Sequence, residues 1–209
     1  MNAPSEHVLR QACESLVARD PILAKAYSKV DLPNWRGTDA HYRTLARIVV
    51  YQLISTEAAD AIWARVEARF AQVTAQGFLV DDRDALLACG LSRPKLEHMT
   101  AIAEAVENGI LDFEALANAP IDDARKTLLS VRGIGPWTAE TFLMNALGHL
   151  DAFPHGDVGL MESYKRLSGA KVRLTSKAFS KQAIAWQPYR AVAAHLLYDW
   201  LHLDRARTR

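Results

Sequence analysis

The chain has 209 residues, half of them hydrophobic, and a formal net charge of +1, so it can form one large domain or two small lobes with a substantial core. No apolar run reaches the ~20 residues that a membrane-spanning helix needs, and the first residues lack the basic start and apolar core of a secretory signal. The only cysteines, Cys13 and Cys89, argue against a disulfide framework and an all-cysteine metal site. We therefore expect a protein of the reducing cytoplasm that has no membrane partner.

Charge is distributed unevenly along the chain. From Ser130 onward there are 11 lysines and arginines and 6 acidic residues, whereas the first 129 residues hold 14 basic and 18 acidic side chains. The later part of the chain is therefore basic and the earlier part acidic. This surplus is a weak indication of contact with phosphates, and an ordinary solvated face would explain it equally well.

Apolar residues at helical spacing predict helices along the whole chain, beginning with Val8–Val17, which ends or restarts at Asp20-Pro21. Leu32–Gly37 is a turn-rich linker, and the segment around Gly77 is expected to be a loop. No run alternates between polar and apolar residues over a useful length, so the fold class is all-α with about ten helices. The other expected helix starts and stops, in chain order, are Thr38 or Asp39, Ser55, Asp84, Gly90, Ser92, Gly109, Asp112, Asp122, Ser176 and Pro188.

A glycine hairpin, Val131–Gly135, joins two of these helices. The second helix starts at Pro136, where a missing N–H costs nothing. The free N–H groups of the hairpin, with a helix dipole behind them, predict a phosphate site without sequence preference. A bare Gly-x-Gly would favour a plain corner between two helices. The longer run, in which Leu128, Val131 and Ile134 point inward, is more specific.

The hairpin run and the loop Phe153–Asp157 together resemble the helix-hairpin-helix (HhH-GPD) DNA glycosylase superfamily. The form Gly-Ile-Gly-x-Trp-Thr-Ala in particular resembles the AlkA-type 3-methyladenine DNA glycosylases, in the compact form without an N-terminal β domain. The similarity extends over most of residues 32–202. It implies a single domain of residues 1–209 with two helical lobes and a cleft between them. One lobe would span roughly 35–150, and the other would combine the N-terminal helices with roughly 151–209.

The resemblance assigns the catalytic carboxylate to Asp157. This residue precedes a predicted helix, where the helix dipole favours an ionised acid. An aspartate before a helix is more often only a capping residue, but the hairpin about twenty residues upstream favours the catalytic interpretation. A purine alkylated on a ring nitrogen carries a positive charge and leaves readily. The remaining sugar then needs a nearby negative charge and a water molecule, and Asp157 can serve both.

The base pocket should be aromatic, because an electron-poor base stacks well on aromatic faces. The resemblance indicates Trp137 and Tyr189, although both could instead be core residues. Thr141 stands where AlkA-type relatives can carry a further pocket aromatic, and the smaller threonine would open the pocket. His155 either contacts a phosphate or the target base, or is exposed and inert. Trp137 also stands where the strand-cleaving relatives carry a nucleophilic lysine, so we expect hydrolysis without lyase activity.

The remaining site residues are expected to contact the DNA backbone or to fill the stack. By resemblance, Leu53 is the wedge that replaces the flipped nucleotide, although a core leucine is an equally good interpretation. The resemblance also suggests that the backbone carbonyls of Leu129, Val131 and Ile134 hold a Na⁺ or K⁺ ion that bridges to phosphate. No other cofactor is expected, and no histidine shows ligand spacing for a transition metal. The predicted DNA-contacting residues are Arg132, Gly133, Ile134, Gly135, Thr138, Gln52, Leu53 and Ser55.

The sequence thus predicts a monofunctional DNA glycosylase that removes 3-methyladenine and 7-methylguanine from double-stranded DNA and initiates base excision repair. We expect a monomer in the cytoplasm, associated with the nucleoid of a bacterial-type cell. One alternative is a non-catalytic helix-hairpin-helix DNA-binding module. Another is a glycosylase of the same fold for uncharged lesions such as hypoxanthine, although those need an acid for the leaving group and none is obvious.

Overall fold

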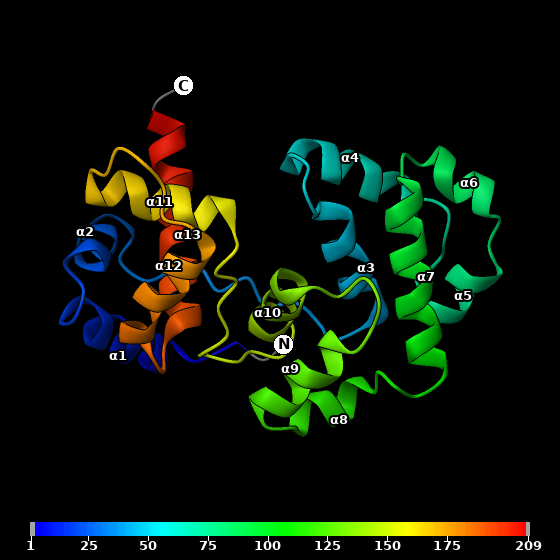
Figure 1. The fold of residues 1–209 in the computed structure, drawn as a ribbon, viewed down its shortest axis with the longest axis horizontal. Coiled ribbons are helices and arrows are strands. Elements are labelled where there is room, and N and C mark those ends of the chain that lie inside the picture. Colours follow the sequence, from blue (N-terminus) through cyan, green and yellow to red (C-terminus); the bar gives the residue numbers. More distant parts are fainter. Residues whose placement is uncertain (1–2, 208–209) are drawn as a thin grey trace. The chain divides into compact units, whose positions relative to one another are not determined.

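The computed structural model describes residues 3–207, and these form 13 α-helices and one short 3-10 helix, with no strand (Figure 1). The predicted all-α class is confirmed. The number of helices exceeds the expected ten. One reason is α5 (Ala75–Val80), which lies where a loop was expected and, with six residues, is too short for a clear apolar period. The chain divides into two compact units: unit 2 comprises Asp39–Phe142, and unit 1 comprises the segments before and after it.

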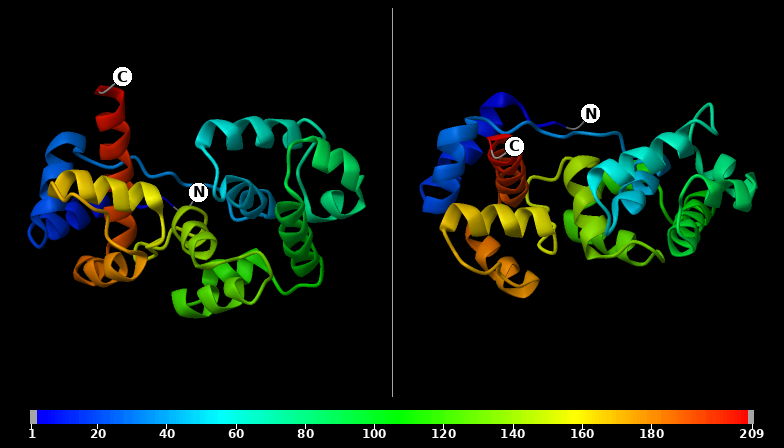
Figure 2. Two further views of the ribbon diagram at one scale, coloured as in Figure 1. Left: turned by 45° about the horizontal axis from the view of Figure 1, so that its top comes forward. Right: turned by 90° about the horizontal axis from the view of Figure 1, so that it is seen from above.

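In unit 1, the long helix α13 (red in Figure 1) packs against α1, α2 and α11. Every side chain of α13 from 191 to 197 is buried, and so is Leu201, so this helix forms part of the core of unit 1. The left view in Figure 2 shows α11 (yellow) crossing α13 (red), against which it packs. The elements of unit 1 are α1 (Glu6–Val17), α2 (Pro21–Val30), α11 (Val158–Ser168), α12 (Ser176–Gln182), η1 (Ala183–Trp186) and α13 (Arg190–Arg207).

In unit 2, the helix α7 packs against α3, α5 and α6, and α3 also packs against α4. The chain leaves unit 2 within α10 (Pro136–Asn145), since Leu143 already belongs to unit 1. The other helices of unit 2 are α3 (Tyr42–Tyr51), α4 (Thr56–Glu67), α5 (Ala75–Val80), α6 (Arg83–Ala88), α7 (Arg93–Glu107), α8 (Phe113–Asn118) and α9 (Ile121–Leu129).

Several helix boundaries follow the predicted capping residues. The Ser55 hydroxyl accepts the Ala58 N–H at 3.2 Å, and the Ser92 hydroxyl accepts the Lys95 N–H at 3.4 Å. The expected stop at Gly109 is a residue with φ of +70°, a conformation that glycine adopts at little cost. These predictions are therefore confirmed.

Other predicted boundaries are wrong. Helix α3 follows His41, which makes no side-chain cap bond, rather than Thr38 or Asp39. The Thr175 hydroxyl, one residue before Ser176, caps α12. The segment around Gly77 is the helix α5, since the Thr74 hydroxyl accepts the Gly77 N–H at 3.0 Å. Competing Ser, Thr and Asp side chains near each boundary make the sequence signal ambiguous by one or more residues.

Aromatic side chains form the centre of unit 1. Trp186 is fully buried, and its ring lies 5.4 Å from Phe153 and 5.7 Å from Phe179, centroid to centroid. The indole N–H of Trp186 donates to the buried Asp20 carboxylate at 2.8 Å, which satisfies both polar groups. This arrangement holds Phe153, and with it the start of the loop that leads to Asp157. Within residues 3–207, no helix has the length and apolar character needed to cross a bilayer.

Candidate functional site

The hairpin between α9 and α10 has the inward apolar side chains that the sequence predicted. Leu128, Val131 and Ile134 are all buried, with exposed fractions of 0, 7 and 4%. The turn is closed by the Val131 N–H to the Leu128 carbonyl at 3.2 Å and the Ile134 N–H to the Val131 carbonyl at 3.1 Å. These contacts anchor the hairpin in unit 2 and leave Arg132 exposed at its tip.

The two glycines of the hairpin differ in backbone conformation and in packing. Gly133 has φ of +94°, and a Cβ atom there would lie 2.5 Å from His98 Cβ and 2.9 Å from His98 Cα. Only glycine therefore lets the hairpin pack against α7. Gly135 has no positive φ, and a Cβ atom there would meet nothing within 4 Å. The turn does not require glycine at 135, but the open space there would let another molecule approach the backbone.

An ion pair that the sequence analysis missed braces the hairpin. Arg125 on α9 bonds to the Glu140 carboxylate on α10 and also pairs with Asp122. The side chains of Arg125 and Glu140 are 24 and 11% exposed, so this pair is largely shielded from water. The pair joins the helices on either side of the turn. Its members are 15 residues apart, a spacing that no helical pattern marks.

The hairpin presents unused backbone donors. In the described part of the chain, the N–H groups of Gly133 and Gly135 donate to no carbonyl or side chain. They adjoin the first turn of α10, at the positive end of the helix dipole. The Thr138 side chain is only 1% exposed and its hydroxyl accepts from the Gln52 amide at 2.8 Å. Any contact of Thr138 with DNA must therefore use its backbone.

The segment between α3 and α4 projects an apolar side chain. Leu53 has φ of +60° and is fully exposed, so the interpretation as a core leucine is wrong. Such a conformation costs a residue other than glycine roughly 1–3 kcal/mol, and it persists only where the surroundings enforce it. Its neighbour Gln52 is the C-cap of α3, and the Gln52 side-chain amide donates to the Thr138 hydroxyl. This bond fixes the backbone before Leu53 next to α10.

A largely apolar hollow of about 410 Å³ lies beside Leu53 in unit 2. Lys95 lines it and donates to the Val50 carbonyl at 2.6 Å, at the end of α3. Burial lowers the pKa of the Lys95 ammonium. This bond satisfies a carbonyl at the C-terminus of α3 and so supports the backbone that precedes Leu53.

Asp157 lies at the N-terminus of α11 in unit 1. Its carboxylate accepts the Leu160 N–H at 2.9 Å, and its own N–H donates to the Pro154 carbonyl at 2.8 Å. The residue is therefore a helix cap, as the simpler interpretation held, and it is also partly exposed. A cap role and a catalytic role are compatible, since only part of the carboxylate is used by the helix.

The loop before Asp157 is fixed at its beginning. The Arg190 guanidinium forms a two-pronged ion pair with the Asp151 carboxylate, at 2.9 and 2.8 Å. The Ala191 N–H also donates to the Leu150 carbonyl at 2.9 Å. Both bonds join the start of α13 to the loop. A bidentate arginine–carboxylate pair sets orientation as well as distance, so Asp151 and Arg190 are positioning residues that the sequence analysis missed.

The four predicted pocket residues are distributed between the units. Trp137 and Thr141 lie on α10 in unit 2, and the Thr141 hydroxyl donates to the Trp137 carbonyl at 2.7 Å. Tyr189 and His155 lie in unit 1 and are partly exposed. The arrangement of these side chains around a target base stays a prediction.

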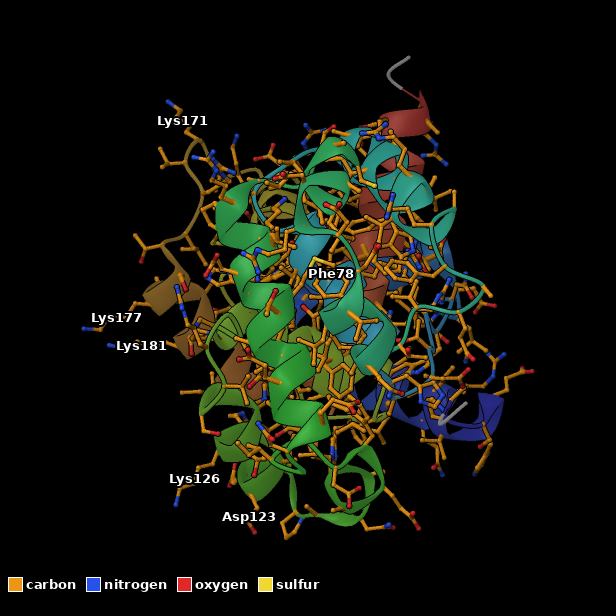
Figure 3. All side chains as sticks on the ribbon, turned by 90° about the vertical axis from the view of Figure 1, so that its right-hand side faces the viewer. Phe78, Asp123, Lys126, Lys171, Lys177 and Lys181 are labelled. Atoms are coloured by element: carbon orange, nitrogen blue, oxygen red, sulfur yellow. The ribbon has the colours of Figure 1, made fainter. Side chains whose placement is uncertain are left out.

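Basic side chains are exposed in unit 1 near the end of α11 and on α12. Lys171, Lys177 and Lys181 point away from the molecule in Figure 3 and are all exposed. Ser176, at the start of α12, lies 3.7 Å from the position that a Gly156 Cβ would take, so α12 begins beside the Asp157 loop.

Among the described residues, no group of three or more His, Cys, Asp or Glu side chains could hold a metal ion.

Solved structures of similar fold include two glycosylases. The chain is similar to the 3-methyladenine DNA glycosylase Mag1 of Schizosaccharomyces pombe in complex with abasic DNA, with a TM-score of 0.81, 25% identity, and coverage of 90% of this chain and 95% of that one. It is also similar to a DNA-3-methyladenine glycosidase of Bacillus halodurans, with a TM-score of 0.78, 31% identity, and coverage of 93 and 91%.

Similar sequences carry the same kind of name. The chain is 35% identical over 108 residues to a DNA-3-methyladenine glycosylase of Bacillus subtilis, covering 52% of this chain but only 36% of that relative. It is 24% identical over 221 residues to a DNA-3-methyladenine glycosylase of Saccharomyces cerevisiae, covering 97 and 73%. The model of the HhH-GPD superfamily base excision DNA repair proteins matches residues 46–188. The chain therefore belongs to the HhH-GPD superfamily of base excision DNA repair proteins.

Proposed function

We propose that the chain is a monofunctional DNA glycosylase that hydrolyses the N-glycosidic bond of alkylated purines, chiefly 3-methyladenine and 7-methylguanine, in double-stranded DNA. Family membership and the names of its relatives support a glycosylase that binds DNA. The observation that carries the proposal is the environment of Asp157, a partly exposed carboxylate fixed at a helix N-terminus by the Leu160 N–H. A pure DNA clamp has no use for this acid.

The hairpin would hold the DNA backbone. The unused N–H groups of Gly133 and Gly135 suit one phosphate, and Arg132 at the exposed tip adds positive charge. Because these donors read no base edges, binding by this motif is independent of sequence. A repair enzyme needs that property, since damage arises in any sequence.

Leu53 would fill the gap that a flipped nucleotide leaves in the stack. Extruding a base costs a few kcal/mol of stacking and pairing, and an inserted apolar side chain offsets part of that cost. A leucine that is fully exposed in the protein alone, with φ of +60°, is available for this role without rearrangement of a core.

Asp157 would act on the sugar once the base departs. The alkylated purine already carries a positive charge, so its departure needs no acid and leaves a sugar with oxocarbenium character. The carboxylate stabilises this developing charge and accepts a proton from the attacking water. With Trp137 where a lyase would have its lysine, no covalent imine can form there, and the strand stays intact.

The remaining features of the proposal concern partners and surroundings. We place the enzyme in the cytoplasm, associated with the nucleoid, and acting as a monomer. A Na⁺ or K⁺ ion between the hairpin carbonyls of Leu129, Val131 and Ile134 and a DNA phosphate would strengthen the grip. The Val131 carbonyl already accepts the Ile134 N–H, which leaves one lone pair for such an ion.

Chromatography of the bases released from methylated DNA tests the proposal. The wild-type protein should release 3-methyladenine and 7-methylguanine, and the DNA strand should remain intact until alkali cleaves the abasic site. Release of hypoxanthine alone from an inosine-containing duplex would favour the glycosylase of uncharged lesions. Equal affinity for methylated and unmethylated DNA with no released base would favour the non-catalytic module.

A further inference from the structure

A tyrosine on α13 contacts the proposed catalytic carboxylate. Tyr198 donates a hydrogen bond from its side chain to Asp157. The position that a Gly159 Cβ would take lies 3.1 Å from Asp157 Oδ1 and 3.8 Å from Tyr198 Cε1, so the ring and the carboxylate meet next to Gly159. Asp157 thus accepts from two protein donors, the Leu160 N–H and the Tyr198 hydroxyl.

The packing of α11 against α13 fixes this contact. The buried Ser163 hydroxyl on α11 donates to the Leu197 carbonyl on α13 at 2.8 Å. Leu197 immediately precedes Tyr198, so this bond sets the register of the two helices at the tyrosine. Gly159 has no side chain to separate them at the next turn. The distance from Tyr198 to Asp157 therefore does not depend on a flexible loop.

Arg36 holds the other side of the tyrosine. Its guanidinium carbon lies 5.5 Å from the centre of the Tyr198 ring, and it pairs with the Asp199 carboxylate. Asp199 also accepts the Asn34 N–H at 2.7 Å, which fixes the linker that carries Arg36. A cation over the ring withdraws electron density and makes the phenol a better hydrogen-bond donor.

The tyrosine remains protonated. Burial, followed by the negative charge of Asp157 and the hydrogen bond to it, raises the pKa of the Tyr198 hydroxyl well above its ordinary value. The hydroxyl is therefore protonated near neutral pH and can donate to the carboxylate.

We propose that Tyr198, anchored by Arg36, is a positioning residue that fixes the orientation of the Asp157 carboxylate toward the sugar. The inference rests on the proposed catalytic role of Asp157 and adds a second residue to the machinery. Tyr198 itself does not touch the substrate. A merely structural tyrosine would affect stability without altering the excision rate of the folded protein.

The test is Tyr198→Phe, which keeps the ring and removes only the donor. A hydrogen bond to a charged group corresponds to about a 10-fold effect or more, so the single-turnover excision rate should fall about 10-fold while DNA affinity stays unchanged. Tyr164→Phe is the matched control, since this partly buried tyrosine of α11 packs against Phe179 and Trp186.

A second readout does not depend on activity. The Asp157 carboxyl ¹³C resonance of the DNA-free protein, assigned by comparison with Asp157→Asn, reports the hydrogen bonds that the carboxylate accepts. It should shift in Tyr198→Phe, and by less in Arg36→Gln, which keeps the hydroxyl. A resonance that stays unchanged in Tyr198→Phe would overturn the inference. Full excision by Asp157→Asn would instead overturn the catalytic role of Asp157, so the two failures are distinguishable.

Discussion

The change Gly133→Ala tests how the hairpin is held. In the left-handed region, alanine costs about 1–2 kcal/mol relative to glycine. The new methyl group would lie 2.5 Å from His98 Cβ and 2.9 Å from a backbone atom, so α7 or the hairpin must shift. Forcing a group into a packed site costs about 1–3 kcal/mol. Replacing glycine also lowers the conformational entropy of the unfolded chain, which stabilises the protein by about 0.4–1 kcal/mol. The net expected loss of unfolding free energy is about 2–4 kcal/mol.

Thermal unfolding measures this loss. For a chain of this size each kcal/mol shifts the Tm by about 2–4 °C, so Gly133→Ala should melt roughly 5–15 °C below the wild type. Gly135→Ala is the control, because its methyl group meets nothing and its φ is not positive. It should change the unfolding free energy by less than about 0.5 kcal/mol, yet weaken DNA binding. A Gly133→Ala protein whose Tm equals that of the wild type, or is no lower than that of Gly135→Ala, would refute this reasoning.

Three further outcomes are expected from other parts of the chain. Leu53→Ala should leave the unfolding free energy within about 0.5 kcal/mol of the wild type, because the side chain is fully exposed, while it lowers excision from duplex DNA; a large loss of stability in denaturant titration would show that Leu53 is packed after all. Glu140→Gln should cost about 1–3 kcal/mol in the same titration, since it leaves the shielded Arg125 guanidinium without its main partner, and an unchanged midpoint would contradict the brace. Burial, with Arg36 nearby, lowers the pKa of His195 to about 3, so the unfolded chain binds a proton below about pH 6.5 that the folded protein does not. Stability should therefore fall by about 2 kcal/mol between about pH 7 and pH 5, and His195→Gln should lack this part of the pH dependence; a constant difference between the two proteins across that range would disprove it.

Local sequence signals predicted the elements of the fold well where one residue determines the geometry. The caps at Ser55 and Ser92 and the stop at Gly109 depend on a side-chain oxygen or on positive φ, and both are properties of a single residue. The predicted boundaries failed where neighbours compete, as with Thr175 and Ser176. The inward side chains of the hairpin were predictable because their spacing matches a helical period.

The contacts that position the site were not predictable from the sequence. Arg190 and Asp151 are 39 residues apart, and Arg125 and Glu140 are 15 apart, so only the tertiary fold brings each pair together. For Leu53, the sequence pattern suggested a buried side chain, but the structure shows an exposed one. Leu53 continues the apolar spacing of α3, yet the helix ends at Tyr51 and the backbone turns into positive φ, which places the side chain in solvent.

Single-turnover excision of 3-methyladenine by Asp157→Asn tests the central claim most directly. The asparagine keeps the shape of the side chain and its cap bond to the Leu160 N–H, but removes the negative charge. The account predicts a loss of rate of several orders of magnitude, with unchanged affinity for DNA that contains an abasic-site analogue. Excision at the wild-type rate by a folded Asp157→Asn protein would contradict it.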